Sequence, residues 1–91
     1  MQRPVGLWYL YHNMPKRHVL NVFALGGEHD ANGVASALNF LIAWSTVQEQ
    51  LRACVRQKLL HRRWDGVRYL YVLTEKGAAR LEYWQRLEGD L

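Results

Sequence analysis

The chain has 91 residues, which allows one domain with a single modest core and excludes a second core of useful size. Twelve lysines and arginines against eight acidic residues give a net charge of +4, which favours a polyanionic partner. The longest apolar stretch, residues 40–44, is far shorter than the roughly 20 residues of a transmembrane helix. A lone cysteine excludes an intramolecular disulfide, and no apolar signal segment opens the chain. We therefore expect residues 1–91 to form one cytoplasmic domain with no membrane partner.

Residues 5–11 predict a short strand, because aromatic and β-branched residues there lie between Pro4 and the turn-forming residues 13–15. The sequence does not identify the pairing partner of this strand. The segment could pair with a hairpin of the same chain, exchange with a second protomer, or form a helical arm instead.

A first helix is predicted from Pro15, which suits a first helical turn, to the stop at Gly26 and Gly27. Its apolar side comprises Val19, Leu20, Phe23 and Ala24. A second helix is predicted after a cap at Asp30 or Asn32. Its buried side comprises Val34, Ala35 and Leu38. The connection over residues 39–44 is longer and more apolar than a tight turn, so either the second helix continues further or this connection packs into the core.

A third helix is predicted over residues 45–58. Ser45 can cap its free amides, and Gln48, three residues later, can complete a capping box. At about 100° per residue, one apolar stripe comprises Val47, Leu51, Cys54 and Val55. The opposite side comprises Ser45, Glu49, Arg52 and Arg56. This polar side is the part of the helix that we expect to be free for a partner.

Residues 59–73 predict a β-hairpin with strands over residues 59–63 and 67–73. Asp65 and Gly66 mark the tip, because Asp-Gly is a strong turn signal. Arg62, Arg63 and Arg68 surround this tip, and with three residues of the third helix they place six positive charges within 17 positions. The sequence therefore predicts one local basic patch on the third helix and the hairpin.

Thr74 predicts the cap of a last helix over residues 74–88. Leu81, Trp84 and Leu87 add apolar surface to this helix, and Tyr83 adds more. A single small core has little room for all of them. We therefore expect Leu81, Trp84 and Leu87 to form an interface between two protomers.

The end of the hairpin reads Tyr-Val-Leu-Thr-Glu-Lys-Gly over residues 71–77. This stretch resembles the strand that closes the wing in winged helix-turn-helix proteins, especially the MarR-like and PadR-like small prokaryotic transcription regulators. The resemblance covers about residues 16–80. It implies an α+β, mostly α fold, with a three-helix core, a β-hairpin wing and a carboxyl-terminal helix.

The resemblance and the basic patch together predict that the chain binds double-stranded DNA as a homodimer. The third helix would enter the major groove, where Arg52 or Arg56 donates two hydrogen bonds to guanine and Gln48 or Glu49 contacts adenine or cytosine. The hairpin arginines would reach phosphates or the minor groove. The expected DNA-binding residues are Ser45, Thr46, Gln48, Glu49, Arg52, Arg56, Arg62, Arg63 and Arg68.

Several alternatives stay open from the residues alone. Arg52 and Glu49 could form an ordinary solvated pair, and the hairpin charge could be the kind that edge strands carry against aggregation. Trp64 either contacts the DNA backbone or packs on its own hairpin. The most direct function is a transcription regulator, a repressor or autoregulator. Plasmid or phage segregation as a centromere-binding protein, and a winged helix used to dock other proteins, are the alternatives.

No catalytic or metal-binding pattern is present. His12, His18, His29 and His61 lack the spacing of metal ligands, and Cys54 belongs to the apolar stripe of the third helix. We expect no enzyme activity, no cofactor and no metal. We also expect no pocket for a small-molecule effector, because the chain is shorter than the regulators it resembles. Whether Cys54 is sensitive to oxidation stays open.

Overall fold

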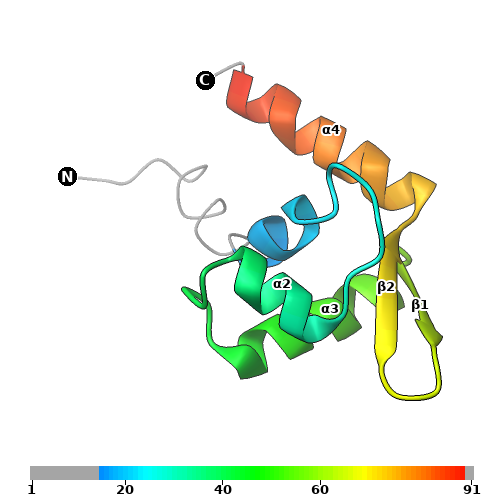
Figure 1. Cartoon of the computed structure of the whole chain (residues 1–91). Helices are drawn as coiled ribbons and strands as arrows, with labels where there is room; N and C mark the ends of the chain where they lie inside the picture. Colours follow the sequence, from blue (N-terminus) through cyan, green and yellow to red (C-terminus); the bar gives the residue numbers. More distant parts are fainter. Residues whose placement is uncertain (1–14, 90–91) are drawn as a thin grey trace.

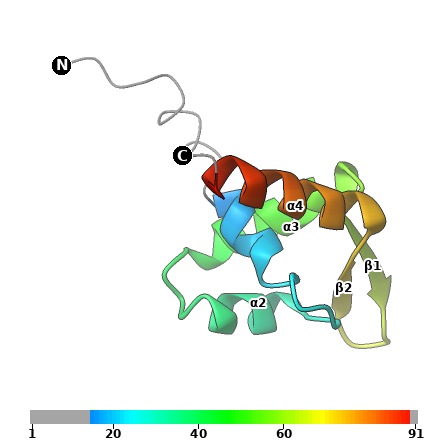
Figure 2. The same cartoon turned by 90° about the horizontal axis from the view of Figure 1, so that it is seen from above.

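The computed structural model describes residues 15–89 (Figure 1). Residues 15–21 are helical, and the elements that follow are α2 (Ala31–Ala37), α3 (Trp44–Arg56), β1 (Leu60–Trp64), β2 (Tyr69–Leu73) and α4 (Glu75–Gly89). Their order and type are those predicted, although the expected strand over residues 5–11 lies outside the described residues. The helical segment 15–21 lies between α4 and the pair formed by α2 and α3, and the hairpin stands at one end (Figures 1 and 2).

One apolar cluster joins all of these elements. Its fully buried members are Val19, Leu20, Phe23, Val34, Val47, Leu51, Cys54 and Leu59. Each aliphatic side chain of this kind contributes about 1.5–3 kcal/mol when it leaves water. The stripe predicted for the third helix is confirmed, because Val47, Leu51 and Cys54 are buried and Val55 packs against the same cluster.

The first helical segment ends earlier than predicted. Residues 22–25 form turns, in which the N–H of Phe23 donates to the carbonyl of Leu20 at 3.0 Å. Ala24 is exposed and is not part of the apolar side. Gly26 and Gly27 have φ angles of +85° and +87°, a region that glycine occupies without strain. The helical segment therefore ends at residue 21, five residues before the first glycine.

The cap predicted for α2 is confirmed at Asp30, whose Oδ1 accepts the N–H of Gly33 at 2.7 Å. The helix ends at Ala37, so it does not continue into the apolar connection. Phe40 and Leu41 are exposed, and from residues 39–43 only Ile42 packs against the core. Packing of this connection into the core is therefore limited to one side chain.

The cap predicted for α3 is wrong. The helix begins at Trp44, and its N-cap residue, Ala43, has no side chain that could accept a hydrogen bond. Ser45 is already inside the first turn, so a capping box between Ser45 and Gln48 does not form. The amino-terminal amides of α3 are thus not satisfied by a side-chain cap.

The hairpin is antiparallel, and its register pairs Leu60 with Leu73 and Trp64 with Tyr69. β1 is shifted by one residue from the predicted range 59–63, and β2 begins two residues later than predicted. The connection over residues 65–68 is held by Asp65, whose Oδ1 accepts the N–H groups of Val67 and Arg68 at 2.9 Å each. On the other edge of β2, His29 and Tyr71 exchange two backbone hydrogen bonds of 3.1 and 2.9 Å. The sequence did not predict this third strand contact, which ties the loop before α2 to the hairpin.

The start of α4 is fastened to the end of α3 and the start of β1. Thr74 caps α4, as predicted, by accepting the N–H of Gly77 at 3.0 Å. Its hydroxyl also points at the carbonyl oxygens of Lys58 and Leu59, at 2.6 and 3.0 Å. A Cβ at Gly77 would lie 2.1 Å from the carbonyl oxygen of Leu59. The Thr-x-x-Gly spacing is therefore explained by a close approach of two backbones.

Candidate nucleic-acid interface

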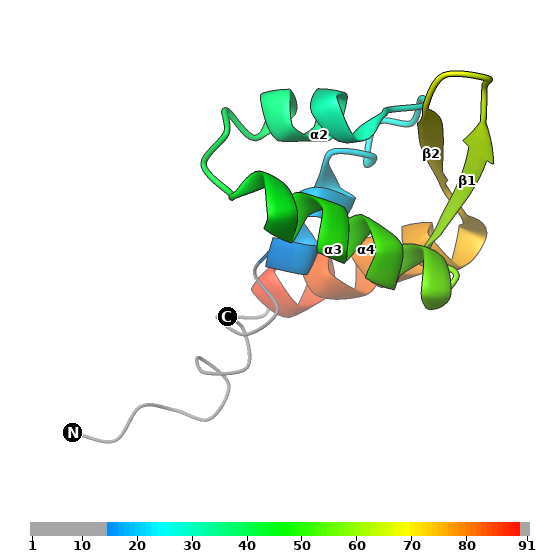
Figure 3. The same ribbon diagram turned by 90° about the horizontal axis from the view of Figure 1, so that it is seen from below.

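The polar side of α3 faces solvent, as predicted. Ser45, Glu49, Arg52 and Arg56 are all exposed, on the side opposite the buried stripe. Neither arginine forms an ion pair or hydrogen bond with another of the residues 15–89. In Figure 3, α3 runs across the molecule with its carboxyl-terminal end next to the hairpin. This face can therefore offer two guanidinium groups to a partner without first breaking an internal contact.

Gln48 and Thr46 lie on the two flanks of that face. Both are half-buried, and at 100° per residue they are separated by about 160° around the helix axis. Gln48 is on the flank toward the hairpin, where it lines a hollow together with Trp44. Only one of these two flanks can face the centre of a groove, so Gln48 and Thr46 cannot both contact the same base edges.

The hairpin turns one face toward this hollow. Because side chains alternate along a strand, Arg62, Trp64 and Tyr69 share the face of the buried Tyr71. The rings of Trp64 and Tyr69 meet edge to face, with their centroids 5.0 Å apart. The guanidinium of Arg62 lies 4.3 Å from the centroid of Tyr69 on the same face. Trp64 thus packs on its own hairpin while more than half of it stays exposed.

The other two hairpin arginines are bound to acidic residues of the loop before α2. Arg63 donates from Nε and Nη2 to both carboxylate oxygens of Glu28, at 2.7 and 3.0 Å. This hydrogen bond is the main reason why the pKa of Glu28 lies below its usual value and that of Arg63 above. Arg68 donates to Asp30 at 2.7 Å and lies 3.6 Å from Asp65. The positive patch predicted for the hairpin is therefore partly neutralised.

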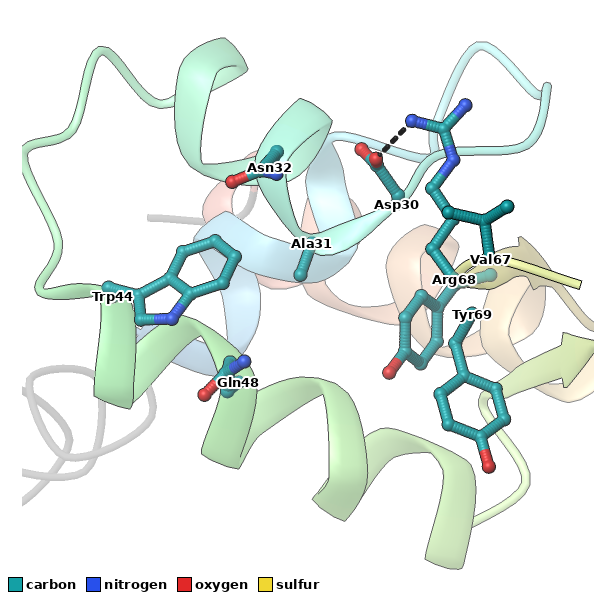
Figure 4. A pocket seen from close by; sticks show the side chains of 9 residues that line it. Asp30, Ala31, Asn32, Trp44, Gln48, Val67, Arg68 and Tyr69 are labelled. Carbon is teal, nitrogen blue, oxygen red and sulfur yellow. Dashed lines mark hydrogen bonds and ion pairs between the residues drawn. The ribbon is translucent and has the colours of Figure 1, made fainter. Parts of the chain in front are cut away.

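A hollow of about 440 Å³ lies between the start of α2, the start of α3 and β2 (Figure 4). Trp44 and Gln48 line it from α3, and Val67, Arg68 and Tyr69 line it from the hairpin. Asp30 and Asn32 close the third side. The third helix and the hairpin therefore border one hollow, although only Arg68 of the six residues in the predicted basic patch lines it.

Comparison with known proteins finds similarity among solved structures. No family model matches the chain, and no curated protein matches it. Among solved structures, the chain is similar to the crystal structure of MepR, a transcription regulator of the Staphylococcus aureus multidrug efflux pump MepA. The TM-score is 0.67 at 26% sequence identity, and the match covers 84% of this chain and 57% of MepR. The chain thus spans a little over half the length of that structure.

The chain has the winged helix fold. MepR is a MarR-family regulator, so the resemblance stated from residues 71–77 is confirmed. In this fold, β1 and β2 are the wing, and α3 is the helix placed beside it. The α+β, mostly α architecture predicted from the sequence is confirmed as well.

Of the three residues predicted for an interface between protomers, two are buried within this chain and only Leu87 is exposed. Leu81 and Trp84 are buried in the core of their own chain, and Arg17 lies 5.7 Å from the centroid of the Trp84 ring. They hold α4 on the domain and are not free for a second chain. Leu87 and Tyr83 are exposed, so these two carry the apolar surface that α4 still offers.

Sequence reasoning missed three features of the winged helix surface. Glu28 and Asp30 were not recognised as partners of the wing arginines, because they lie 35 and 38 positions away in the chain. Tyr69 was assigned only to a strand, although it contacts both Arg62 and Trp64. Its register opposite Trp64, which depends on the position of the turn, was the signal that could have found it.

Cys54 is buried in the core, and burial raises the pKa of its thiol to about 11. At neutral pH the thiol is therefore protonated and a weak nucleophile. Within residues 15–89, no three His, Cys, Asp or Glu side chains gather in a way that could hold a metal ion. In the same part of the chain, no helix is long and apolar enough to cross a membrane.

Proposed function

We propose that the chain is a sequence-specific double-stranded DNA-binding protein that acts as a dimeric transcription regulator, a repressor or autoregulator. The observation that carries this proposal is the exposed side of α3, on which Arg52 and Arg56 have no acidic partner among residues 15–89. The wing and the start of α3 border one hollow, which Gln48 and Arg68 line from the two sides. The similarity to MepR, a transcription regulator, supports the proposal.

In this proposal, α3 lies in the major groove, which is wide enough for one helix. Arg52 or Arg56 donates two hydrogen bonds to guanine, while Gln48 or Glu49 contacts adenine or cytosine. Ser45 and Thr46, in the first turn of α3, contact backbone phosphates in this proposal. Specific base contacts thus come from α3, and the wing fixes the position of the domain.

Selection of bound duplexes from a random pool tests sequence-specific binding. We expect enrichment of one motif, and a pseudo-palindrome if two protomers bind together. Binding without any enriched sequence would overturn the regulator and leave a nonspecific DNA-binding protein. A footprint that covers a tiled array of sites, instead of one, would favour segregation over regulation.

For the dimer, Tyr83 and Leu87 are exposed large apolar side chains of α4. Sedimentation at low micromolar concentration should report about twice the chain mass of 10.7 kDa. Replacing Tyr83 and Leu87 together with Asp should give the monomer mass, because charged side chains are depleted at the centre of interfaces. Gln85→Asp, on another side of α4, is the matched control and should leave the dimer intact. A wild-type monomer would remove the dimer from the proposal.

A further inference from the structure

The connection between α2 and α3 is exposed and carries no charge. Phe40 is 72% exposed and Leu41 is 85% exposed. Ala37 and Ala43, on either side of them in the chain, are exposed as well. The uncharged run extends beyond the connection, because residues 31–48 include no Lys, Arg, Asp, Glu or His in a chain whose net charge is +4. We name Ala37, Phe40, Leu41 and Ala43 the apolar ridge.

Backbone hydrogen bonds hold the ridge at the end of α2. The N–H of Asn39 donates to the carbonyl of Ser36 at 2.9 Å. The N–H of Phe40 donates to the carbonyl of Ala35 at 3.0 Å. These two bonds form the Schellman motif, in which a side chain at the place of Phe40 frequently packs back on the helix. Here Ala35 is buried and Phe40 projects into solvent instead.

The conformation of Phe40 is unusual for so large a residue. The φ angles of Asn39 and Phe40 are +53° and +55°. Asparagine tolerates this left-handed region, whereas a bulky residue there is an outlier. Residues strained in this way cluster at binding sites and switch regions. The ridge is therefore a fixed projection of the domain that keeps its largest side chain in solvent.

The ridge lies apart from the surfaces assigned so far. In Figure 3, the connection between α2 and α3 is at the end of α3 opposite the hairpin. In Figure 1, α4 lies on the other side of the helical segment 15–21. The proposed dimer contact of Tyr83 and Leu87 on α4 thus does not use the ridge.

We propose that the ridge is a contact between neighbouring dimers on DNA, in which the ridge of one chain packs against the ridge of a second copy. This inference rests on the proposed DNA-binding function and adds cooperativity between adjacent sites to it. A twofold axis between the two chains would place Phe40 of each against Leu41 of the other, because such a contact uses the same patch twice.

Charge favours a second copy as the occupant of the ridge. Two copies of a chain with a net charge of +4 repel each other over most of their surface. A contact between identical patches also brings like charges together, unless the patch has none, and residues 31–48 meet that condition. DNA phosphates neutralise the remaining repulsion on a duplex. An anionic lipid surface, in contrast, is recognised through basic side chains, which this run lacks.

The area of the ridge indicates a weak contact. Its side chains offer on the order of 300–400 Å² of apolar surface, since a large aromatic side chain contributes about 150–250 Å². Two such ridges bury less than the roughly 1,200 Å² of stable interfaces, so they do not hold two dimers together in solution. Adjacent sites on one duplex raise the local concentration of the second dimer into the millimolar range. At that concentration a weak contact becomes significant.

Duplexes with one or two copies of the selected motif test the contact. With two motifs, the second wild-type dimer should bind about tenfold more tightly than the first, because a contact with a dissociation constant of about 0.1 mM meets a local concentration of about 1 mM. Inserting about 5 base pairs, half a helical turn, should remove this gain. Phe40→Ser with Leu41→Ser should also remove it and leave binding to the single motif unchanged. Leu25→Ser, at a fully exposed apolar position outside the ridge, is the matched control and should keep the gain.

A glycine variant separates the contact from the fold. Glycine adopts a φ of +55° without strain, so Phe40→Gly should not lower the urea midpoint of unfolding. The same variant should lose the gain at the second motif. A lower midpoint together with an unchanged gain would assign Phe40 to stability and overturn the contact.

Three other results would overturn the contact while the proposed function stands, because the single motif is still bound in each. One is independent binding of two wild-type dimers at every spacing. Another is an equal loss of the gain with Leu25→Ser. The third is weaker binding of the Phe40→Ser, Leu41→Ser protein to the single motif, which would mean that the ridge contacts DNA. If the wild type bound no duplex at all, the proposed function would be overturned and the ridge contact with it.

Discussion

The arginines of α3 and those of the wing belong to one basic stretch of sequence, yet the fold uses them differently. Arg52 and Arg56 project into solvent with no acidic partner among the described residues. Arg63 and Arg68 are bound to Glu28 and Asp30. A count of positive residues along a segment therefore overstates the charge that a polyanion can meet. The available charge depends on acids that only the folded chain brings near.

The different roles of the α3 and wing arginines depend on how α3 and the wing are held relative to each other. Gly77 packs against Leu59, between these two elements, and its replacement should have the largest effect. Gly77→Ala should lower the free energy of unfolding by about 3 kcal/mol or more, although alanine favours helix, because its Cβ would lie 2.1 Å from the carbonyl oxygen of Leu59. Urea unfolding measures this loss. Lys76→Ala, at the exposed neighbouring position, should change the same quantity by less than about 0.5 kcal/mol. An unchanged unfolding midpoint for Gly77→Ala would mean that the two backbones can separate freely.

The α3 side of the comparison predicts a loss of base recognition. Arg52→Ala should weaken binding to the selected duplex by about 1–3 kcal/mol and relax the preference at one base pair. Binding to duplexes with each substitution at that base pair measures both effects. Arg80→Ala removes the same charge from an exposed position of α4 and is the matched control. Equal weakening on all duplexes would assign Arg52 to phosphate instead of a base.

For the wing, we expect that neutralising Glu28 makes the charge of Arg63 available to DNA. Glu28→Gln should raise the salt slope by about 0.9 for each protomer, because Arg63 then becomes available to phosphate. Glu82→Gln, which releases Arg86 on α4, is the matched control and should leave the slope unchanged. If Glu28→Gln also left the slope unchanged, Arg63 would be too far from the duplex to matter.

The same pair has a pH dependence with a definite sign. The pKa of Glu28 is lowered by the hydrogen bond from Arg63, so the pair stabilises the folded state above the usual carboxyl pKa of 4.5. This stabilisation is lost as the pH falls from 4.5 through the lower folded value. Acid unfolding curves of the wild type and of Glu28→Gln should therefore converge at low pH. Curves that stayed parallel from pH 6 to pH 3 would show that the pair adds no stability.

The smallest effect concerns Cys54, a buried residue of α3. Because burial raises the pKa of its thiol to about 11, alkylation by iodoacetamide at pH 8 should be slow in the folded protein and fast in urea. The unfolded thiol ionises at lower pH than the folded one. Stability should therefore fall as the pH rises from about 9 to about 11. Rapid alkylation of the native protein would indicate that the core beneath α3 opens easily.

Patterns over a few neighbouring residues predicted the helix caps and the buried side of α3. The cap at Asp30, the cap at Thr74 and the buried stripe of α3 each depend on residues three or four positions apart, and all three are confirmed. The cap at Ser45 failed although its pattern was equally good, because α3 begins one residue earlier. A local pattern thus locates a helix end only to within a residue or two.

Contacts between distant residues could not be predicted in this way. The His29–Tyr71 bridge, the pair of Glu28 with Arg63 and the burial of Leu81 and Trp84 all depend on how the elements pack. From the sequence, Leu81 and Trp84 exceeded what a small core was expected to hold. In the structure they pack in the same cluster as Val19 and Leu20, a contact between distant residues that no local pattern indicates. The predicted DNA-binding residues stay predictions, with α3 and the wing bordering one hollow in their support.

The hydroxyl of Thr74 rests on the carbonyl groups of Lys58 and Leu59, just after α3 ends and just before the wing begins. Because of this joint, α4 cannot tilt relative to α3 and the wing unless these hydrogen bonds break. In the proposed dimer held together along α4, the crossing angle of the two α4 helices would therefore set the distance between the two copies of α3.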